Sequence, residues 1–372
     1  MQVFIGARVF DGDRWRDDSA LVVEGGRVQA IVAIDQRPAA EIVDLGGGMV
    51  SPGFVDWQVN GGGGYLFNAD PTPETIRGIV AAHRRFGTTA LAPTVITDAP
   101  EVLASALEAA REDIPGSLGA HVEGPFIDPR RKGAHPERHI RAMSDADARR
   151  LVEARARVVT LAPASVSLEL ISWLAANGVI VSLGHSDASA EEARACFDAG
   201  VRTVTHLYNA MSQLGSRAPG VVGAALEDTR IYAGFIADGL HAQEIAGRLA
   251  YRLKGSSRLT LVSDAMPPAA GGPDIYDLNG RQVKREGLRL TLEDGTLAGA
   301  VITMLDAVRF AARRLGAALE DALRMATSTP ARLLRVETQH GVLAPGAHAN
   351  FVHLGDDLAL RGVWFSGERV EA

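Results

Sequence analysis

Segment 179–211 carries one unit of a repeating pattern, and this pattern limits the fold more than any other feature of the chain. The apolar run Val179–Leu183 leads into His185, and the apolar run Val201–Thr205 leads into His206, with an Ala- and Glu-rich helical pattern between them. Two apolar strands joined by a helix form a βαβ unit with parallel strands. Neighbouring strands lie about 4.8 Å apart, so both histidines can reach one metal ion. A pair of hydrogen-bonded structural histidines is the alternative interpretation.

The same alternation of apolar runs and helical patterns extends from Phe54 to Ser263. Helices are predicted, for example, at Pro73–Arg85 and Ala99–Arg111. This repetition predicts an α/β fold, a (β/α)8 TIM-like barrel whose active site lies at the C-terminal ends of its strands. The predicted barrel strands are Phe54–Val59, Thr88–Thr94, Leu118–Val122, Val158–Ala162, Val179–Leu183, Val201–Thr205, Tyr232–Ile236 and Leu259–Ser263.

The two ends of the chain have a different pattern. Residues 1–49 contain short β runs separated by Asp-Gly, Gly-Gly and Pro, which predicts a small antiparallel sheet. Residues 341–372 return to short β runs. We expect both segments to form one small β-sandwich domain beside a barrel domain of residues 50–340. A β-hairpin is predicted near Asp277–Leu292.

Charge and composition exclude several classes of partner. The net charge of −7 at pH 7 argues against nucleic acid or an anionic membrane as a partner. No apolar run reaches the ~18 residues of a membrane span, and the N-terminal sequence does not have the pattern of a secretory signal. The single cysteine, Cys196, excludes an internal disulfide and suits a reducing compartment, so a cytoplasmic enzyme is expected.

Several predicted barrel strands end in a carboxylate or an imidazole. Glu123, His185 and His206 follow the third, fifth and sixth strands. His241 follows the seventh strand, and Asp264 follows the eighth. Glu, His and His with a water form a common set of zinc ligands in hydrolases. Asp264, on an opposite strand, is the natural base for a metal-activated water.

Longer motifs surround these residues and span nearly the whole chain. They are Pro52–Asp56, His121–Phe126, Lys132–His135, Gly184–Ser186, Thr205–Met211, Arg217–Gly220, Asp238–His241, Ser263–Ala265 and Leu297–Gly299. In this order they resemble the amidohydrolase superfamily and, within it, the family of N-acetylglucosamine-6-phosphate deacetylases. The combination of HVEGPF, THLYNAM and DGLH is specific to the deacetylase branch, whereas PGFVD is typical of the superfamily.

The resemblance implies an activity and a set of roles. The activity is hydrolysis of the N-acetyl group of N-acetyl-D-glucosamine 6-phosphate to D-glucosamine 6-phosphate and acetate. By resemblance, Glu123, His185 and His206 bind the metal. Asp264 takes a proton from the attacking water and delivers it to the amine leaving group. His135 orients or polarises the acetyl carbonyl.

The resemblance also implies contacts to the phosphorylated amino sugar. Asn209, Ala210 and His241 resemble the family's sugar-phosphate contacts. Arg217 resembles an arginine that reaches the phosphate of the neighbouring subunit's substrate, which implies a homodimer; a solvated loop arginine is the alternative. A guanidinium suits this role because it can bind phosphate through two hydrogen bonds. The residues expected to contact substrate are Gln58, Asn60, Ala134, His135, Asn209, Ala210, Arg217 and His241.

Gln58 and Asn60 bear on the number of metal ions. Positions two apart on a strand point to the same face, and many amidohydrolases carry His-x-His here to hold a second metal. Amide oxygens are weak ligands for zinc, so we expect one divalent ion per chain. Zinc is the expected ion, although a Glu/His₂ set also accepts Fe²⁺ or another divalent ion.

Two alternative functions stay open at this point. One is another amidohydrolase, such as a dihydroorotase or an N-acyl amino acid deacylase, although the chain lacks both the His-x-His pair and an obvious metal-bridging lysine near Leu161-Ala162-Pro163. The other is a non-catalytic, amidohydrolase-like assembly protein. Such a protein should have lost its ligands, whereas this chain keeps Glu123, His185, His206 and Asp264 together.

Overall fold

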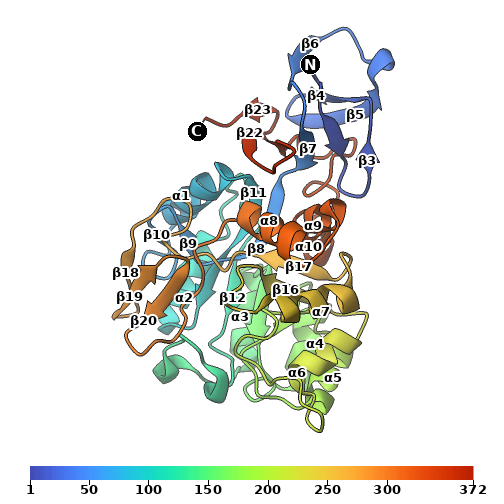
Figure 1. Cartoon of the computed structure of the whole chain (residues 1–372). Helices are drawn as coiled ribbons and strands as arrows, with labels where there is room; N and C mark the ends of the chain where they lie inside the picture. Colours follow the sequence, from blue (N-terminus) through green and yellow to red (C-terminus); the bar gives the residue numbers. More distant parts are fainter. Residues whose placement is uncertain (372) are drawn as a thin grey trace.

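The computed structural model describes residues 1–371, and its centre is an eight-stranded parallel sheet whose strand order follows the chain. The sheet closes on itself because the Asp264 amide donates to the Gln58 carbonyl at 3.0 Å and Val59 bridges Ala265 in parallel. Each strand is followed by a helix (Figure 1), which confirms the predicted barrel. Its strands are β8 Phe54–Val59, β11 Thr88–Ile96, β12 His121–Glu123, β13 Val158–Leu161, β14 Ile180–Leu183, β15 Thr203–Val204, β16 Tyr232–Ile236 and β17 Leu259–Val262.

Helices surround this barrel (Figure 1), and local sequence determines where several of them begin. The side chains of Thr72, Ser144 and Ser189 each accept a hydrogen bond from a backbone N–H three residues further on. Gly200, with φ of 121°, ends one helix where a left-handed conformation is needed. The helices are α1 Pro73–Arg84, α2 Pro100–Ala109, α3 Asp145–Glu153, α4 Leu168–Ala176, α5 Ala190–Ala199, α6 Gly220–Glu227, α7 Glu244–Lys254, α8 Met304–Arg314, α9 Leu319–Ala326 and α10 Ser328–Leu334.

The barrel strands are buried on both faces because one face contacts the helices and the other fills the barrel. Trp57 is fully buried, and its indole N–H donates to Thr260 Oγ1 at 3.0 Å. The Thr205 hydroxyl lies 2.7 Å from Thr160 Oγ1 and 2.5 Å from Ser182 Oγ. These polar groups pair with one another, so the barrel interior carries a hydrogen-bonded layer below the strand ends.

The two ends of the chain meet in two small sheets above the barrel in Figure 1. Phe4 from one sheet lies 4.9 Å from Phe351 of the other, and Phe351 stacks on Trp364 at 5.0 Å. Buried apolar residues from both sheets form this shared core, as expected for a β-sandwich. One sheet has the order β5-β4-β1-β6, with β1 Gln2–Ile5, β4 Ser19–Glu24, β5 Arg27–Ala33 and β6 Glu41–Asp44.

Both small sheets correct one expectation. We predicted a wholly antiparallel arrangement for residues 1–49, but β1 pairs with β6, and β2 with β7, in parallel. Both pairs are separated by intervening strands in the sequence, so no tight turn forces them to be antiparallel. The second sheet has the order β23-β22-β21-β7-β2-β3, with β2 Arg8–Phe10, β3 Trp15–Arg16, β7 Met49–Pro52, β21 Phe351–Leu354, β22 Leu360–Phe365 and β23 Glu368–Arg369.

The segment after the last barrel strand also differs from its prediction. A hairpin was predicted near Asp277–Leu292, and the structure has a three-stranded antiparallel sheet, because Asn279-Gly280 and Gly287 make two turns with positive φ. The Arg281 guanidinium donates to the Ala134 carbonyl, which ties this sheet to the loop before His135. Its strands are β18 Ile275–Leu278, β19 Arg281–Glu286 and β20 Arg289–Leu292; a further hairpin is formed by β9 Gly61–Gly62 and β10 Tyr65–Leu66.

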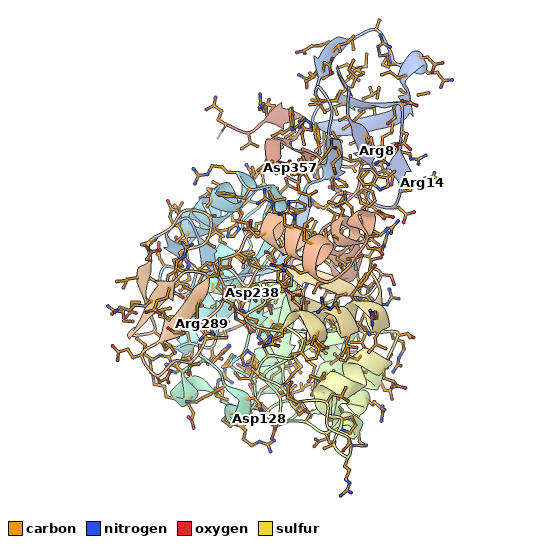
Figure 2. The ribbon with its side chains drawn as sticks, in the orientation of Figure 1. Arg8, Arg14, Asp128, Asp238, Arg289 and Asp357 are labelled. Atoms are coloured by element: carbon orange, nitrogen blue, oxygen red, sulfur yellow. The ribbon has the colours of Figure 1, made fainter. Side chains whose placement is uncertain are left out.

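Charged side chains lie both on the terminal sheets and around the barrel. Figure 2 shows Arg8 and Asp357 among the terminal sheets, whereas Asp238 lies within the barrel and Asp128 at its far edge. Within residues 1–371, no helix has both the length and the apolar character needed to cross a membrane.

Candidate active site

Three side chains from barrel strand ends converge on one point. Glu123 ends β12, His185 follows β14, and His206 follows β15. Glu123 Oε1 lies 3.2 Å from His185 Nε2 and 3.0 Å from His206 Nε2, and the two Nε2 atoms are 3.1 Å apart. Both histidines have positive φ, at 47° and 32°. Such backbone conformations are uncommon outside glycine and cluster at functional sites.

The chemistry of this donor set fits a divalent metal ion. Bonds of about 2.0–2.1 Å to a tetrahedral zinc place neighbouring ligand atoms about 3.3 Å apart, close to the 3.0–3.2 Å separations here. Burial raises the pKa of Glu123, but hydrogen bonds from His185 and His206 outweigh it and bring the pKa well below its ordinary value. The carboxylate is therefore ionised, as a metal ligand must be.

The two histidines are supported differently on their outer side. His185 Nδ1 lies 2.9 Å from the Arg131 carbonyl, to which it donates if it carries the proton. This bond leaves Nε2 free for a metal, as is usual for metal-ligating histidines. Among the residues that the structure describes, His206 Nδ1 is buried and has no hydrogen-bond partner. The Arg131 side chain forms an ion pair with Asp187 at 2.7 Å.

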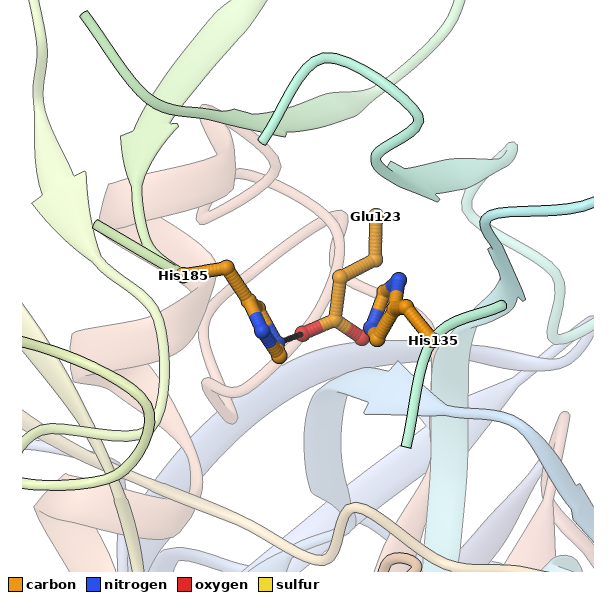
Figure 3. Close-up of side chains that lie close together, drawn as sticks. All are labelled: Glu123, His135 and His185. Carbon is orange, nitrogen blue, oxygen red and sulfur yellow. Dashed lines mark hydrogen bonds and ion pairs between the residues drawn. The ribbon is translucent and has the colours of Figure 1, made fainter. Parts of the chain in front are cut away.

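His135 lies beside His185, with 4.3 Å between the centroids of the two rings. Figure 3 shows both rings next to the Glu123 carboxylate. Glu123, His135 and His185 each offer a ligand atom, all within 4.8 Å of one another. His135 Nδ1 lies 2.8 Å from Thr97 Oγ1 and accepts from the Thr97 backbone N–H at 3.4 Å. Burial, and then the neighbouring His185, lower the pKa of His135 well below its ordinary value.

Asp264 occupies the opposite side of the site. Its Oδ1 accepts from Asn60 Nδ2 at 2.8 Å and from Gln58 Nε2 at 3.1 Å. The same Gln58 nitrogen lies 3.3 Å from Glu123 Oε1, so one amide joins the two carboxylates. Burial, and then the Glu123 charge, raise the pKa of Asp264 to about 6. A carboxyl with a pKa near neutral suits a group that both accepts and donates a proton.

These groups surround one hollow of about 400 Å³, within the range of roughly 300–1,000 Å³ that is usual for small-molecule sites. Gln58 is not a lining residue, but its side-chain amide is hydrogen-bonded to Glu123 and Asp264, which line the hollow. Arg217 is exposed on a loop and is not a lining residue of this hollow. The predicted site residues that line it are Asn60, Glu123, Ala134, His135, His185, His206, Asn209, Ala210, His241 and Asp264.

The residues expected to contact the sugar phosphate are also held in place. His241 Nδ1 lies 2.7 Å from Asp238 Oδ2, a contact that orients the ring. The Asn209 side chain donates to the His206 carbonyl at 3.2 Å. Ala210 has a positive φ of 48°. The stretch from His206 to Ala210 therefore combines a strand end with a tight, hydrogen-bonded turn beside the hollow.

Sequence reasoning did not find every residue of the site. Thr97 contacts His135, and the Arg131 carbonyl contacts His185. Met266 and Leu278 line the hollow. The position of Thr97 directly after β11, at a strand end, was an available signal. Arg131 acts through its carbonyl, which no sequence pattern reveals.

The sequence pattern of the amidohydrolase family matches residues 49–370. The chain belongs to the amidohydrolase family. It is therefore a hydrolase, and the family match covers the barrel, β7 and the C-terminal strands of the small sheets.

Individual relatives resemble this amidohydrolase over nearly its whole length. The N-acetylgalactosamine-6-phosphate deacetylase of Shewanella sp. (strain ANA-3) is 40% identical over 377 residues, covering 99% of this chain and 95% of the relative. The N-acetylglucosamine-6-phosphate deacetylase of Bos taurus is 37% identical over 396 residues, with coverage of 99% and 95%. The crystal structure of N-acetylglucosamine-6-phosphate deacetylase from Pasteurella multocida has a TM-score of 0.95 at 34% identity, covering 99% of both chains.

Proposed function

We propose that this amidohydrolase hydrolyses the acetamide of N-acetyl-D-glucosamine 6-phosphate, giving D-glucosamine 6-phosphate and acetate. The observation that carries the proposal is the convergence of Glu123, His185 and His206 opposite Asp264 around one hollow. The names of relatives at 40% and 37% identity support the substrate class. A dihydroorotase or an N-acyl amino acid deacylase has no such support among these relatives.

Glu123, His185 and His206 are the proposed ligands of one divalent ion, with zinc as the expected metal. When bound, such an ion makes water a nucleophile near neutral pH and polarises the carbonyl of an amide. Gln58 and Asn60 do not favour a second zinc ion, because neutral amide oxygens are weak zinc ligands, and the amide nitrogens of both residues donate to Asp264. Their arrangement keeps them as hydrogen-bond donors inside the site.

Asp264 and His135 carry the proton transfer and the polarisation. An amine is a poor leaving group, so the reaction needs a group that takes a proton from water and returns it to nitrogen. Asp264 serves this role because it is buried at the hollow and its pKa is raised to about 6. His135 lies beside Glu123, lines the same hollow and would donate to the acetyl oxygen.

The sugar phosphate is proposed to lie against Asn209, Ala210 and His241, which line the hollow. Arg217 is exposed and outside the hollow, as a residue that serves the site of a partner subunit would be. We therefore propose a homodimer in which Arg217 binds the phosphate held by the other subunit. The single cysteine, Cys196, is free and buried, in keeping with a cytoplasmic enzyme.

A second candidate substrate is N-acetyl-D-galactosamine 6-phosphate, because the relative at 40% identity carries that name. The test is acetate release from both 6-phosphates and from their unphosphorylated sugars, with and without a chelator. The proposal predicts chelator-sensitive release from N-acetylglucosamine 6-phosphate and much slower release without the phosphate. Faster release from N-acetylgalactosamine 6-phosphate would make that compound the preferred substrate. No acetate release from either 6-phosphate would reject the proposed deacetylase activity.

A further inference from the structure

Thr97 presents two groups to a single nitrogen of His135. It is fully buried directly after β11, and its hydroxyl oxygen lies 2.8 Å from His135 Nδ1. Its backbone N–H points at the same nitrogen, with 3.4 Å between the two nitrogen atoms. His135 is itself buried, with 4% of its surface exposed. The ring therefore has little freedom to exchange these partners for water.

The backbone N–H indicates which form of the ring fits the site. An amide N–H can only donate a hydrogen bond, so the atom that it faces must offer a lone pair. A neutral imidazole has one protonated and one unprotonated nitrogen, and the partner of one nitrogen sets the state of the other. With a lone pair at Nδ1, the proton of the neutral His135 ring lies on Nε2. The Thr97 hydroxyl is the closer partner, at 2.8 Å, and it holds the ring in this form by donating to the same lone pair.

The residue after Glu123 makes this contact possible. Gly124 has φ of 79°, and a Cβ at this position would collide with Thr97 Oγ1 and would lie 3.5 Å from His135 Nδ1. The glycine of the HVEGPF motif thus leaves room for the threonine. From the other side, Asn279 Nδ2 donates to the Thr97 carbonyl at 3.4 Å, which further restricts the backbone whose N–H faces His135.

We propose that Thr97 is a positioning residue that holds His135 in the tautomer with the proton on Nε2. This tautomer makes His135 a hydrogen-bond donor toward the acetyl oxygen of the substrate, and it removes the lone pair that a metal ligand needs at that atom. The inference rests on the proposed deacetylase function and deepens it. It also assigns different roles to His135 and His206, although both lie beside the carboxylate of Glu123.

The opposite tautomer gives a distinct arrangement. His135 Nδ1 would then donate to Thr97 Oγ1, and Nε2 would be free to join Glu123 and His185 as a metal ligand. In that case Thr97 would support metal binding, and its removal would weaken the metal. Hydrogen-bond partners of metal ligands typically contribute about 10–100-fold to metal affinity or to activity. Removal of the Thr97 hydroxyl should therefore lower kcat if His135 is a donor, and metal affinity if His135 is a ligand.

The first measurement is the tautomer itself, by nitrogen NMR of the metal-depleted protein labelled with ¹⁵N-histidine. A His135→Asn variant identifies the His135 signals by their disappearance. The expected result for the wild type is a protonated Nε2 and an unprotonated Nδ1. A protonated Nδ1 would overturn the inference. This reading needs no substrate, so it stands even if the proposed activity fails.

The second measurement compares Thr97→Val with Thr97→Ser. Valine keeps the shape and the backbone N–H but removes the hydroxyl that contacts His135 Nδ1. We expect kcat to fall about 10-fold or more, and we expect the zinc affinity, measured by competition with a chelator, to stay unchanged. Serine should keep most of the activity. Thr88→Val is the matched control, because Thr88 is buried in β11, the strand that Thr97 directly follows, and, within the described chain, its hydroxyl has no hydrogen-bond partner.

Loss of zinc affinity with Thr97→Val, or unchanged kcat, would contradict the role of Thr97. A wild-type protein that releases no acetate from the hexosamine 6-phosphates would instead reject the proposed function. The two failures are therefore distinguishable.

Discussion

At the scale of single residues, Asp264 is the group whose role in proton transfer can be separated from metal binding. Its carboxylate is held by Asn60 and Gln58, and an asparagine of the same shape can stay in that place. Asp264→Asn should retain the metal and lower kcat by about 10²–10⁴-fold, the usual contribution of a general acid–base group. Steady-state kinetics together with metal analysis test this. Near-normal turnover in a metal-loaded variant would remove Asp264 from the mechanism.

The second prediction at this scale separates the two histidines that lie beside Glu123. His206→Ala should lose the metal and the activity, whereas His135→Asn should keep the metal and lose only turnover. The reason is that His206 Nε2 lies 3.0 Å from Glu123 Oε1 and 3.1 Å from His185 Nε2, inside the proposed ligand set. Metal content after dialysis against a weak chelator distinguishes them. The reverse pattern would make Glu123, His135 and His185 the ligands.

At the scale of elements, Asp56 joins the first and last barrel strands below the site. Its carboxylate accepts from the Gln58 N–H at 3.2 Å and from the Ser263 N–H and hydroxyl. Gln58 is part of β8, which Asn60 follows, and Ser263 lies between the end of β17 and Asp264. Burial raises the pKa of Asp56 from 3.8 to about 7, and its hydrogen bonds only partly oppose this shift.

This shift predicts a pH dependence of stability. The folded state holds the Asp56 proton more tightly than the unfolded state does. The resulting contribution of this proton to the free energy of unfolding is complete below pH 3.8 and is lost as pH rises through about 7. Relative to Asp56→Asn, the wild type should lose free energy of unfolding between pH 4 and pH 7. Denaturant unfolding of both metal-depleted proteins across this range measures the difference. Parallel curves would show that Asp56 does not titrate in this way.

The sequence predicts elements better than it predicts the contacts between them. The βαβ periodicity was sufficient for the barrel, because apolar runs and helical patterns alternate with a regular period. It also placed Glu123, His185 and His206 at strand ends. The parallel pairing of β1 with β6 was not predictable, since pairing between segments far apart in sequence depends on tertiary packing. The contact of Thr97 with His135 depends on side-chain distances, which no spacing rule contains.

At the scale of the whole molecule, Arg217 tests whether one chain completes the site of another. Arg217→Ala should raise KM for the 6-phosphate far more than for the unphosphorylated sugar, because in the proposed homodimer the guanidinium would contact only the phosphate. In a mixture of Arg217→Ala and Asp264→Asn subunits, some dimers contain one subunit of each kind. In these hybrids, the site of the Arg217→Ala subunit keeps its own Asp264 and would receive Arg217 from its partner. Random pairing in a two-fold dimer restores about a quarter of the sites. Activity no greater than the sum of the two separate variants would contradict a shared site.

One metal ion, held by Glu123, His185 and His206, is proposed to support hydrolysis of an acetylated hexosamine 6-phosphate. The most direct test is titration of the metal-depleted protein with zinc while acetate release from N-acetylglucosamine 6-phosphate is measured. We predict no release without metal and a linear rise that saturates near one ion per chain. Full release without metal would contradict a metal-dependent reaction. A rise that continues until two tightly bound ions are present, and that requires Gln58 or Asn60, would contradict a single catalytic ion.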